Sequence, residues 1–169
     1  MTKPFSVVGP LLSVLALAAC TTPGGGGASA SSPPSDAARS GPAGGADRTT
    51  GTVVRFATST ASVDVTIGAD NPAVRDFLGM LPLTVEVEEF AGKEKIVRLP
   101  RELRHEGAPG SDPEDGDLIY FVPWGNLGFY YDASGIGYSD QTIHLGTYQA
   151  TRAELARLEG QRVTVAVVD

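Results

Sequence analysis

The sequence predicts a mostly β fold, a closed eight-stranded β-barrel capped by two short helices. Runs that alternate apolar and polar residues recur through residues 51–169, and such alternation is typical of half-buried strands. Only two short stretches have the helical period. Turns rich in Gly and Pro separate the runs, and many short strands joined by such turns favour a barrel.

Residues 1–20 precede this domain and have the pattern of an export signal. Lys3 supplies a positive start, and the apolar run 7–19 is too short for a membrane-spanning helix. The run ends in Leu-Ala-Ala-Cys at Cys20, which resembles the lipobox of bacterial lipoproteins. That resemblance implies lipidation of Cys20 and a membrane anchor through acyl chains. The domain would then face outside the cytoplasm, on the extracellular or periplasmic side.

The alternative for this segment is an ordinary secretory signal cut near Ala18–Ala19, with Cys20 incidental. Cys20 is the only cysteine in the chain, so no disulfide can form within it. A single thiol at the signal boundary favours lipidation over redox chemistry.

Residues 21–50 contain mainly Gly, Ala, Ser and Pro and almost no large apolar side chain. Such a segment cannot bury enough surface to offset its ordering entropy, so we expect a disordered tether. Residues 51–169 then form one domain. The net charge of −7 and the lack of Arg and Lys clusters argue against nucleic-acid binding.

The domain opens with two alternating runs, 52–59 and 61–67, which predict a hairpin. Asn71 followed by Pro is typical of a helix start. Apolar residues then recur at helical spacing to Leu81, and Pro82 ends the pattern. In this helix Asp76 is expected to point away from the apolar face.

The remaining elements follow in order. Thr151 and Glu154 have the spacing of a capping box, which predicts a second short helix that ends near Gly160. The charged segment 100–116 predicts a long loop, either functional or disordered. Strands are expected at 83–90 and 95–99, on either side of Pro-Trp-Gly-Asn within 116–132, and at 142–145 and 162–168.

The richest stretch is 116–132, where two strand-like runs meet at Pro-Trp-Gly-Asn. It holds the only Trp and three of the five Tyr. Aromatic side chains bury the most area, so the core is expected to be densest here. If the two runs pair, Tyr120 and Tyr130 are expected on one face and Tyr131 on the other.

Several segments in order resemble a family of small bacterial proteins with a cyclophilin-like fold, over nearly all of residues 52–150. The resemblance implies an eight-stranded barrel with flanking helices, similar in fold to prolyl isomerases. It is carried by Asp70-Asn71-Pro72-Ala73, Arg75-Asp76-Phe77-Leu78, Met80-Leu81-Pro82-Leu83-Thr84, Lys93-Glu94-Lys95-Ile96, Glu106-Gly107-Ala108-Pro109, Gly116-Asp117-Leu118 and Pro123-Trp124-Gly125-Asn126-Leu127.

The chain lacks the Phe-His-Arg and Gln-Phe-Phe motifs that cyclophilins proper use. An isomerase needs a cation over the prolyl amide nitrogen, and Arg98 or Arg101 are the candidates. The acidic loop 112–117 departs from the calcium-loop pattern, and His105 and His144 lie too far apart to suggest a zinc site. No cofactor and no catalytic residue is indicated.

A binding groove is the remaining candidate site. Its residues would be Trp124 and Asn126 at the turn, Tyr120 and Tyr130 on the flanking strands, Arg98 and Arg101, and His144 at a barrel mouth. The alternative is structural, with Trp124 plugging a barrel end and Asn126 capping the turn through its own backbone. The sequence thus favours a lipoprotein with a non-catalytic module that binds a peptide or protein. A divergent prolyl isomerase and a small-molecule binder are the alternatives.

Overall fold

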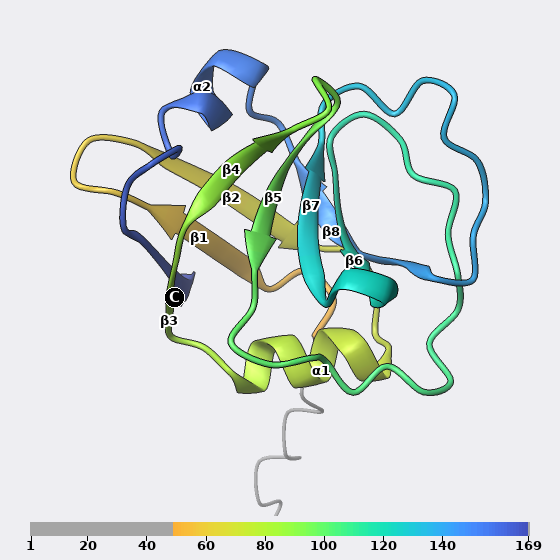
Figure 1. Ribbon diagram of the computed structural model, residues 1–169. Coiled ribbons are helices and arrows are strands. Elements are labelled where there is room, and N and C mark those ends of the chain that lie inside the picture. The colour runs from red at the N-terminus through yellow and green to blue at the C-terminus, as the bar shows by residue number, and fades with distance from the viewer. Residues whose placement is uncertain (1–48, 169) are drawn as a thin grey trace, which may run out of the picture. The chain divides into compact units, whose positions relative to one another are not determined.

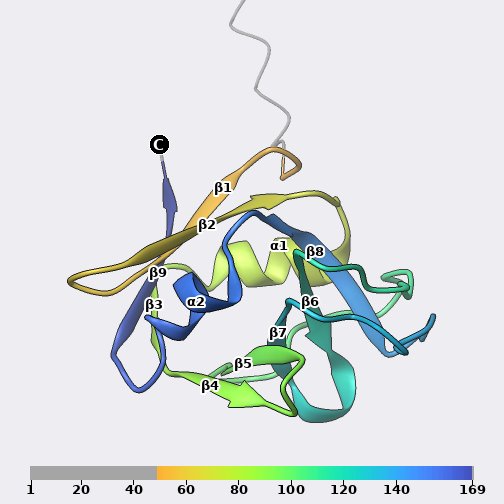
Figure 2. The ribbon, with the colours of Figure 1, turned by 90° about the horizontal axis from the view of Figure 1, so that it is seen from above.

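The computed structural model describes residues 49–168, and the predicted export signal, Cys20 and most of the predicted tether lie outside the described residues. Nine strands form one antiparallel sheet in the order β3-β9-β1-β2-β8-β6-β7-β5-β4. The sheet curls into a barrel (Figures 1 and 2). The strands are β1 (Val53–Ala57), β2 (Ser62–Ile67), β3 (Leu83–Val85), β4 (Val87–Phe90), β5 (Glu94–Arg98), β6 (Asp117–Phe121), β7 (Asn126–Tyr130), β8 (Thr142–Tyr148) and β9 (Val163–Val168).

The two ends of this sheet, β3 and β4, are neighbours in the chain, separated only by Glu86. β3 pairs with β9, and β4 pairs with β5. The segment 83–90, which alternation predicted as one strand, is therefore a bent strand that brings both ends of the sheet together. The predicted mostly β barrel is confirmed, and its eight strands become nine because this bend divides one of them.

Two helices lie at opposite ends of the barrel (Figure 1), and each begins at the capping residue that predicted it. In α1 (Pro72–Gly79), Asn71 Oδ1 accepts a hydrogen bond from the Val74 amide at 2.9 Å. In α2 (Arg152–Ala156), Thr151 and Glu154 form the reciprocal capping box. These caps satisfy amide groups that have no partner within the helix. No helix among residues 49–168 is long and apolar enough to cross a bilayer.

The helical pattern predicted that Asp76 of α1 points to solvent, and this is wrong, because its side chain is only 4% exposed. Its carboxylate accepts hydrogen bonds from the guanidinium groups of Arg101 and Arg104 and from the Arg104 amide. These bonds fix the start of the long segment between β5 and β6 against the helix. They hold the pKa of Asp76 well below its usual range, chiefly through the bond from Arg101.

The same segment is held at its far side by a second loop. Ser111 and Ser139 exchange backbone hydrogen bonds of 3.2 and 3.0 Å, and Ser111 Oγ donates to the Thr142 carbonyl at 2.8 Å.

Carboxylates of the acidic stretch accept bonds from backbone amides, Asp115 from Ala133 and Asp117 from Glu114. The segment 100–116 is thus a packed loop tied to the barrel at several points.

The aromatic stretch forms β6, a short 3-10 helix η1 (Val122–Trp124) and β7. Phe129 of β7 is fully buried and lies edge-on to Phe56 and Tyr148, at centroid distances of 4.9 and 5.2 Å. The prediction for Tyr120 and Tyr130 is wrong. Tyr120 pairs with the inward Leu127 and lies inside the barrel, whereas Tyr130 alternates with Phe129 and lies outside.

Candidate functional site

A pocket of about 160 Å³ opens on the outer face of the barrel, over β4, β5 and β7. Strand pairing assembles it, because directly opposed residues share a face. Glu94 lies opposite both Phe90 and Tyr130, and Asn126 lies opposite Phe121. The lining residues are Phe90, Glu94, Phe121, Trp124, Asn126 and Tyr130.

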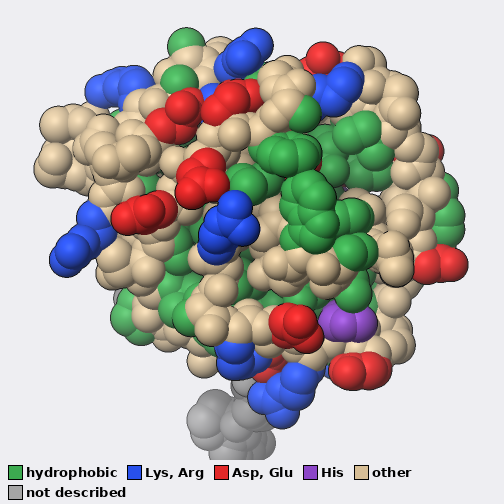
Figure 3. Space-filling model, viewed as in Figure 1, with side chains coloured by type: hydrophobic (Ala, Val, Ile, Leu, Met, Phe, Trp, Pro, Cys, Tyr) green, Lys and Arg blue, Asp and Glu red, His purple; other side chains and the backbone are tan. Residues whose placement is uncertain are grey.

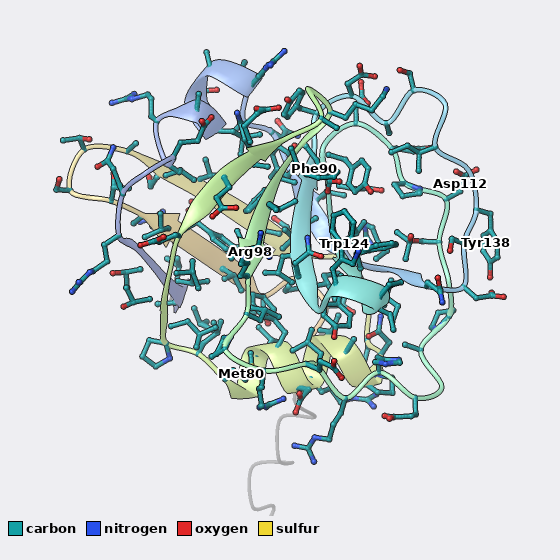
Figure 4. All side chains as sticks on the ribbon, viewed as in Figure 1. Met80, Phe90, Arg98, Asp112, Trp124 and Tyr138 are labelled. Carbon is teal, nitrogen blue, oxygen red and sulfur yellow. The ribbon has the colours of Figure 1, made fainter. Side chains whose placement is uncertain are left out.

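Trp124 forms the rim of this pocket and is 57% exposed. It ends η1, and Gly125 follows with a left-handed φ of 62°, a conformation that favours glycine. The Trp124 ring lies edge-on to Phe90 at 5.1 Å and to Phe121 at 5.5 Å. Trp124 therefore does not plug a barrel end; it lies on the same side of the barrel as Phe90 (Figure 4), and Phe121 is the third aromatic ring that lines the pocket.

Asn126 lies in the floor of the pocket and is only 2% exposed. Its Nδ2 donates to the Leu127 carbonyl at 3.1 Å, so the turn-capping alternative accounts for one end of this amide. Its Oδ1 has no hydrogen-bond partner. A buried acceptor without a partner costs about 1–3 kcal/mol, which a ligand N–H group can recover.

Glu94 supplies the acidic group of the pocket. Burial raises the pKa of its carboxyl to about 7. Burial also raises the pKa of the facing Tyr130 hydroxyl to about 12, with Glu94 as a second cause. A carboxyl that titrates near neutral pH can change the charge of the pocket within the physiological range.

Two further hollows extend the pocket along the outer face of the bent strand and β5. The first, about 470 Å³, shares Phe90 and Trp124 with the pocket and adds Glu88 and Arg98. The second, about 560 Å³, continues from Glu88 and Arg98 to Arg162. On this face of the molecule, Figure 3 shows a patch of hydrophobic side chains (green) with charged side chains (blue and red) beside it. We call the pocket and both hollows the outer groove.

Of the predicted site residues, Trp124, Asn126, Tyr130 and Arg98 lie in the outer groove. The other three do not. Tyr120 is buried in the core, where its hydroxyl accepts from the Leu103 amide at 3.1 Å. Arg101 is bound to Asp76. His144 lies on β8, with Nε2 3.3 Å from Asp117 Oδ1.

Sequence reasoning missed Phe90, Glu94 and Phe121. Each stands at the end of an expected strand or beside one, so alternation alone could have assigned its face. Their meeting depends on which strands pair and in which register, and this is not visible in local alternation. Among residues 49–168, no group of three or more His, Cys, Asp or Glu side chains converges as metal ligands would.

The raised pKa of Glu94 predicts a pH effect on stability. Between the ordinary value of 4.5 and about 7, the folded state keeps a proton that the unfolded chain has lost. The free energy of unfolding should therefore fall as pH rises through this interval, on the order of 1 kcal/mol after solvent screening. Chemical denaturation at pH 5 and pH 8 measures the change. The Glu94→Gln variant should show a smaller fall, and an equal fall in both proteins would contradict the prediction.

A family model described as the cyclophilin-like family matches residues 56–167. No curated protein matches the chain significantly. The solution structure of a hypothetical protein from Archaeoglobus fulgidus is similar at a TM-score of 0.53 and 15% identity, covering 73% of this chain and 99% of that one. At this identity the likeness concerns the fold alone.

Proposed function

The chain belongs to the cyclophilin-like family, and we propose that its domain is a non-catalytic module that binds an extended peptide segment in the outer groove. The observation that carries this proposal is the unpartnered Asn126 Oδ1 beneath an exposed tryptophan. An exposed aromatic rim offers apolar contact to a side chain. The buried acceptor offers a directed bond to a peptide N–H group.

The form of the groove supports an extended ligand. The pocket continues into two hollows along the bent strand and β5, so successive residues of a peptide can follow them. Ligand sites commonly combine apolar walls with a few placed polar groups. Here the polar groups include Glu94 and Asn126 in the pocket and Arg98 farther along.

The single tryptophan of the chain makes the test direct, because all indole emission comes from the groove. Pentapeptides acetyl-Ala-Ala-Xaa-Ala-Ala-amide, with the central residue varied, are titrated into the purified full-length chain. At least one should shift the Trp124 emission and bind by calorimetry. Trp124→Ala should weaken that binding at least tenfold, because the aromatic wall is lost.

Tyr138→Ala is the matched control, since Tyr138 is an exposed aromatic residue on the loop between β7 and β8. It should leave peptide affinity unchanged. The proposal fails if no peptide binds at millimolar concentration, or if Trp124→Ala binds every peptide as well as the unaltered chain does.

Membrane anchoring is part of the same proposal and is supported by the lipobox-like Leu17-Ala18-Ala19-Cys20. Acyl chains on Cys20 would hold the module outside the cytoplasm, with residues 21–50 as the tether. In expressing cells, radiolabelled palmitate should enter the chain and the protein should sediment with membranes. Cys20→Ala should abolish the labelling. Equal labelling of that variant would overturn the anchor.

The second candidate is a divergent prolyl isomerase, favoured by one observation. Arg98 is exposed beside the aromatic pocket, and its one ion pair among residues 49–168 is with Glu88, at 3.4 Å. A cation beside an apolar pocket is the combination that prolyl isomerisation requires. Uncatalysed isomerisation takes tens of seconds, so a catalyst would visibly accelerate cis-to-trans conversion of an Ala-Pro peptide. If the chain accelerates this conversion and Arg98→Ala does not, the function is catalysis and not binding alone.

A further inference from the structure

We infer that the pocket between Trp124, Glu94 and Asn126 receives a protonated primary amine on an alkyl chain, such as the lysine side chain of a bound peptide. This inference rests on the proposed peptide binding and names the chemistry of the residue that anchors it. The methylenes would lie between the aromatic rings. The ammonium would donate to the Glu94 carboxylate and to Asn126 Oδ1.

The polar atoms in the pocket are the first argument. Asn126 lines the pocket, its buried Oδ1 has no hydrogen-bond partner, and its Nδ2 donates to the Leu127 carbonyl. Glu94 adds two carboxylate oxygens, and in the ionised state these accept hydrogen bonds and donate none. A group with several N–H donors satisfies both residues, and an ammonium has three.

The aromatic walls are the second argument. The rings of Phe90 and Phe121 each stand at 86° to the Trp124 ring, so the pocket is enclosed by rings at different angles. Aromatic faces attract cations, and the attraction increases in sites shielded from water. The same rings offer apolar contact to the stem of a long cationic side chain.

Glu94 forms no ion pair with any cation of residues 49–168. The neighbouring cations are already engaged elsewhere. Lys93 Nζ lies 3.5 Å from Asp132 and donates to Ser134. Arg98 forms an ion pair with Glu88. Lys95 points to the other side of β5, where it binds Glu89 and Glu159. A cation from a ligand stabilises the ionised form of a buried carboxylate most when the fold itself places no cation beside it.

A pH dependence follows from these surroundings. Tyr130 of β7 and Phe90 of β4 face Glu94 from the two neighbouring strands. Phe121 and Trp124 close the pocket and carry no ionisable group. Glu88 lies farther along β4, paired with Arg98. Glu94 is thus the group that titrates near neutrality, with a pKa raised to about 7 by burial. Amine binding should strengthen by up to about tenfold from pH 6 to pH 8 as Glu94 ionises.

The test uses three small probes on the full-length chain, read by Trp124 emission and by calorimetry. n-Butylammonium carries the charge, the N–H groups and the alkyl chain of lysine. n-Butanol lacks the charge, and tetramethylammonium lacks the N–H groups. We expect n-butylammonium to bind at least tenfold more tightly than either of the others, with release of protons near pH 7.

Two variants separate the carboxylate from the folding of the site. Glu94→Gln should lower n-butylammonium affinity about tenfold or more and remove its pH dependence. Gly128→Ala offers a second route, because an added Cβ would overlap Glu94 Oε2 and displace the carboxylate without removing it. Glu106→Gln, an exposed acid of the long loop, is the control of equal charge change and should have no effect.

The outcomes distinguish this inference from the proposed function. If pentapeptides bind but a central lysine is no better than norleucine, the amine inference is overturned and peptide binding stands. Equal affinity for n-butanol or tetramethylammonium also overturns it. If neither peptides nor probes bind, the proposed function falls and the inference falls with it. Selective n-butylammonium binding that Glu94→Gln abolishes supports it.

Discussion

Replacing Phe129 by Ala is expected to lower the free energy of unfolding by about 4 kcal/mol. The Phe129 side chain is fully buried on the inner face of β7. Its ring makes edge contacts with Phe56 of β1 and Tyr148 of β8, so it joins parts of the sheet far apart in the chain. Truncation removes these contacts and leaves a cavity that a closed barrel cannot readily collapse.

Urea denaturation followed by far-UV circular dichroism measures this loss. Tyr138→Ala removes an aromatic ring that is 64% exposed and should change the midpoint little. Phe129→Leu should lose less than Phe129→Ala, because it retains part of the volume. A loss below about 1 kcal/mol for Phe129→Ala would mean that the barrel interior is not packed as the structure shows.

Asp76→Asn is expected to lower the free energy of unfolding by about 2 kcal/mol. The substitution removes the charge that accepts from two guanidinium groups and one amide. The effect is smaller than that of Phe129→Ala, because both arginines are partly or largely exposed and can be solvated. The loop after β5 should also become more susceptible to proteolysis, since Asp76 anchors its start.

The pH dependence of this effect has a definite sign. Bonding to Arg101 and Arg104 depresses the pKa of Asp76 in the folded state, so its stabilisation is fully present above the ordinary value of 3.8. It is lost as pH falls below that value. Asp76→Asn should therefore differ most from the unaltered chain near pH 7 and least at pH 2.

The control is Asp64→Asn, which breaks a pair between Asp64 and Arg55 whose side chains are both nearly half exposed. It should change stability far less than Asp76→Asn. Equal losses in the two variants would show that burial of Asp76 is not the source of its effect.

Most of the local structure follows from short-range sequence patterns. Alternation placed the strands, and Asn71 and the Thr151–Glu154 box placed the helix starts. These signals act over a few residues: a strand has a period of two, and a cap bonds an amide three positions away. Many short strands joined by Gly- and Pro-rich turns favoured a barrel, and the resemblance to cyclophilin-like proteins, carried by short motifs in order, implied the same fold.

Which side chains meet depends on how the strands pair and the loops pack. Strand register set Phe90 and Glu94 beside Tyr130 and placed Tyr120 inside the barrel. Asp76 is buried because arginines 25 and 28 residues later reach back to it. Such contacts depend on how a closed sheet pairs its strands and packs its loops. A periodic pattern gives the side of an element on which a residue lies, but it does not specify what lies opposite.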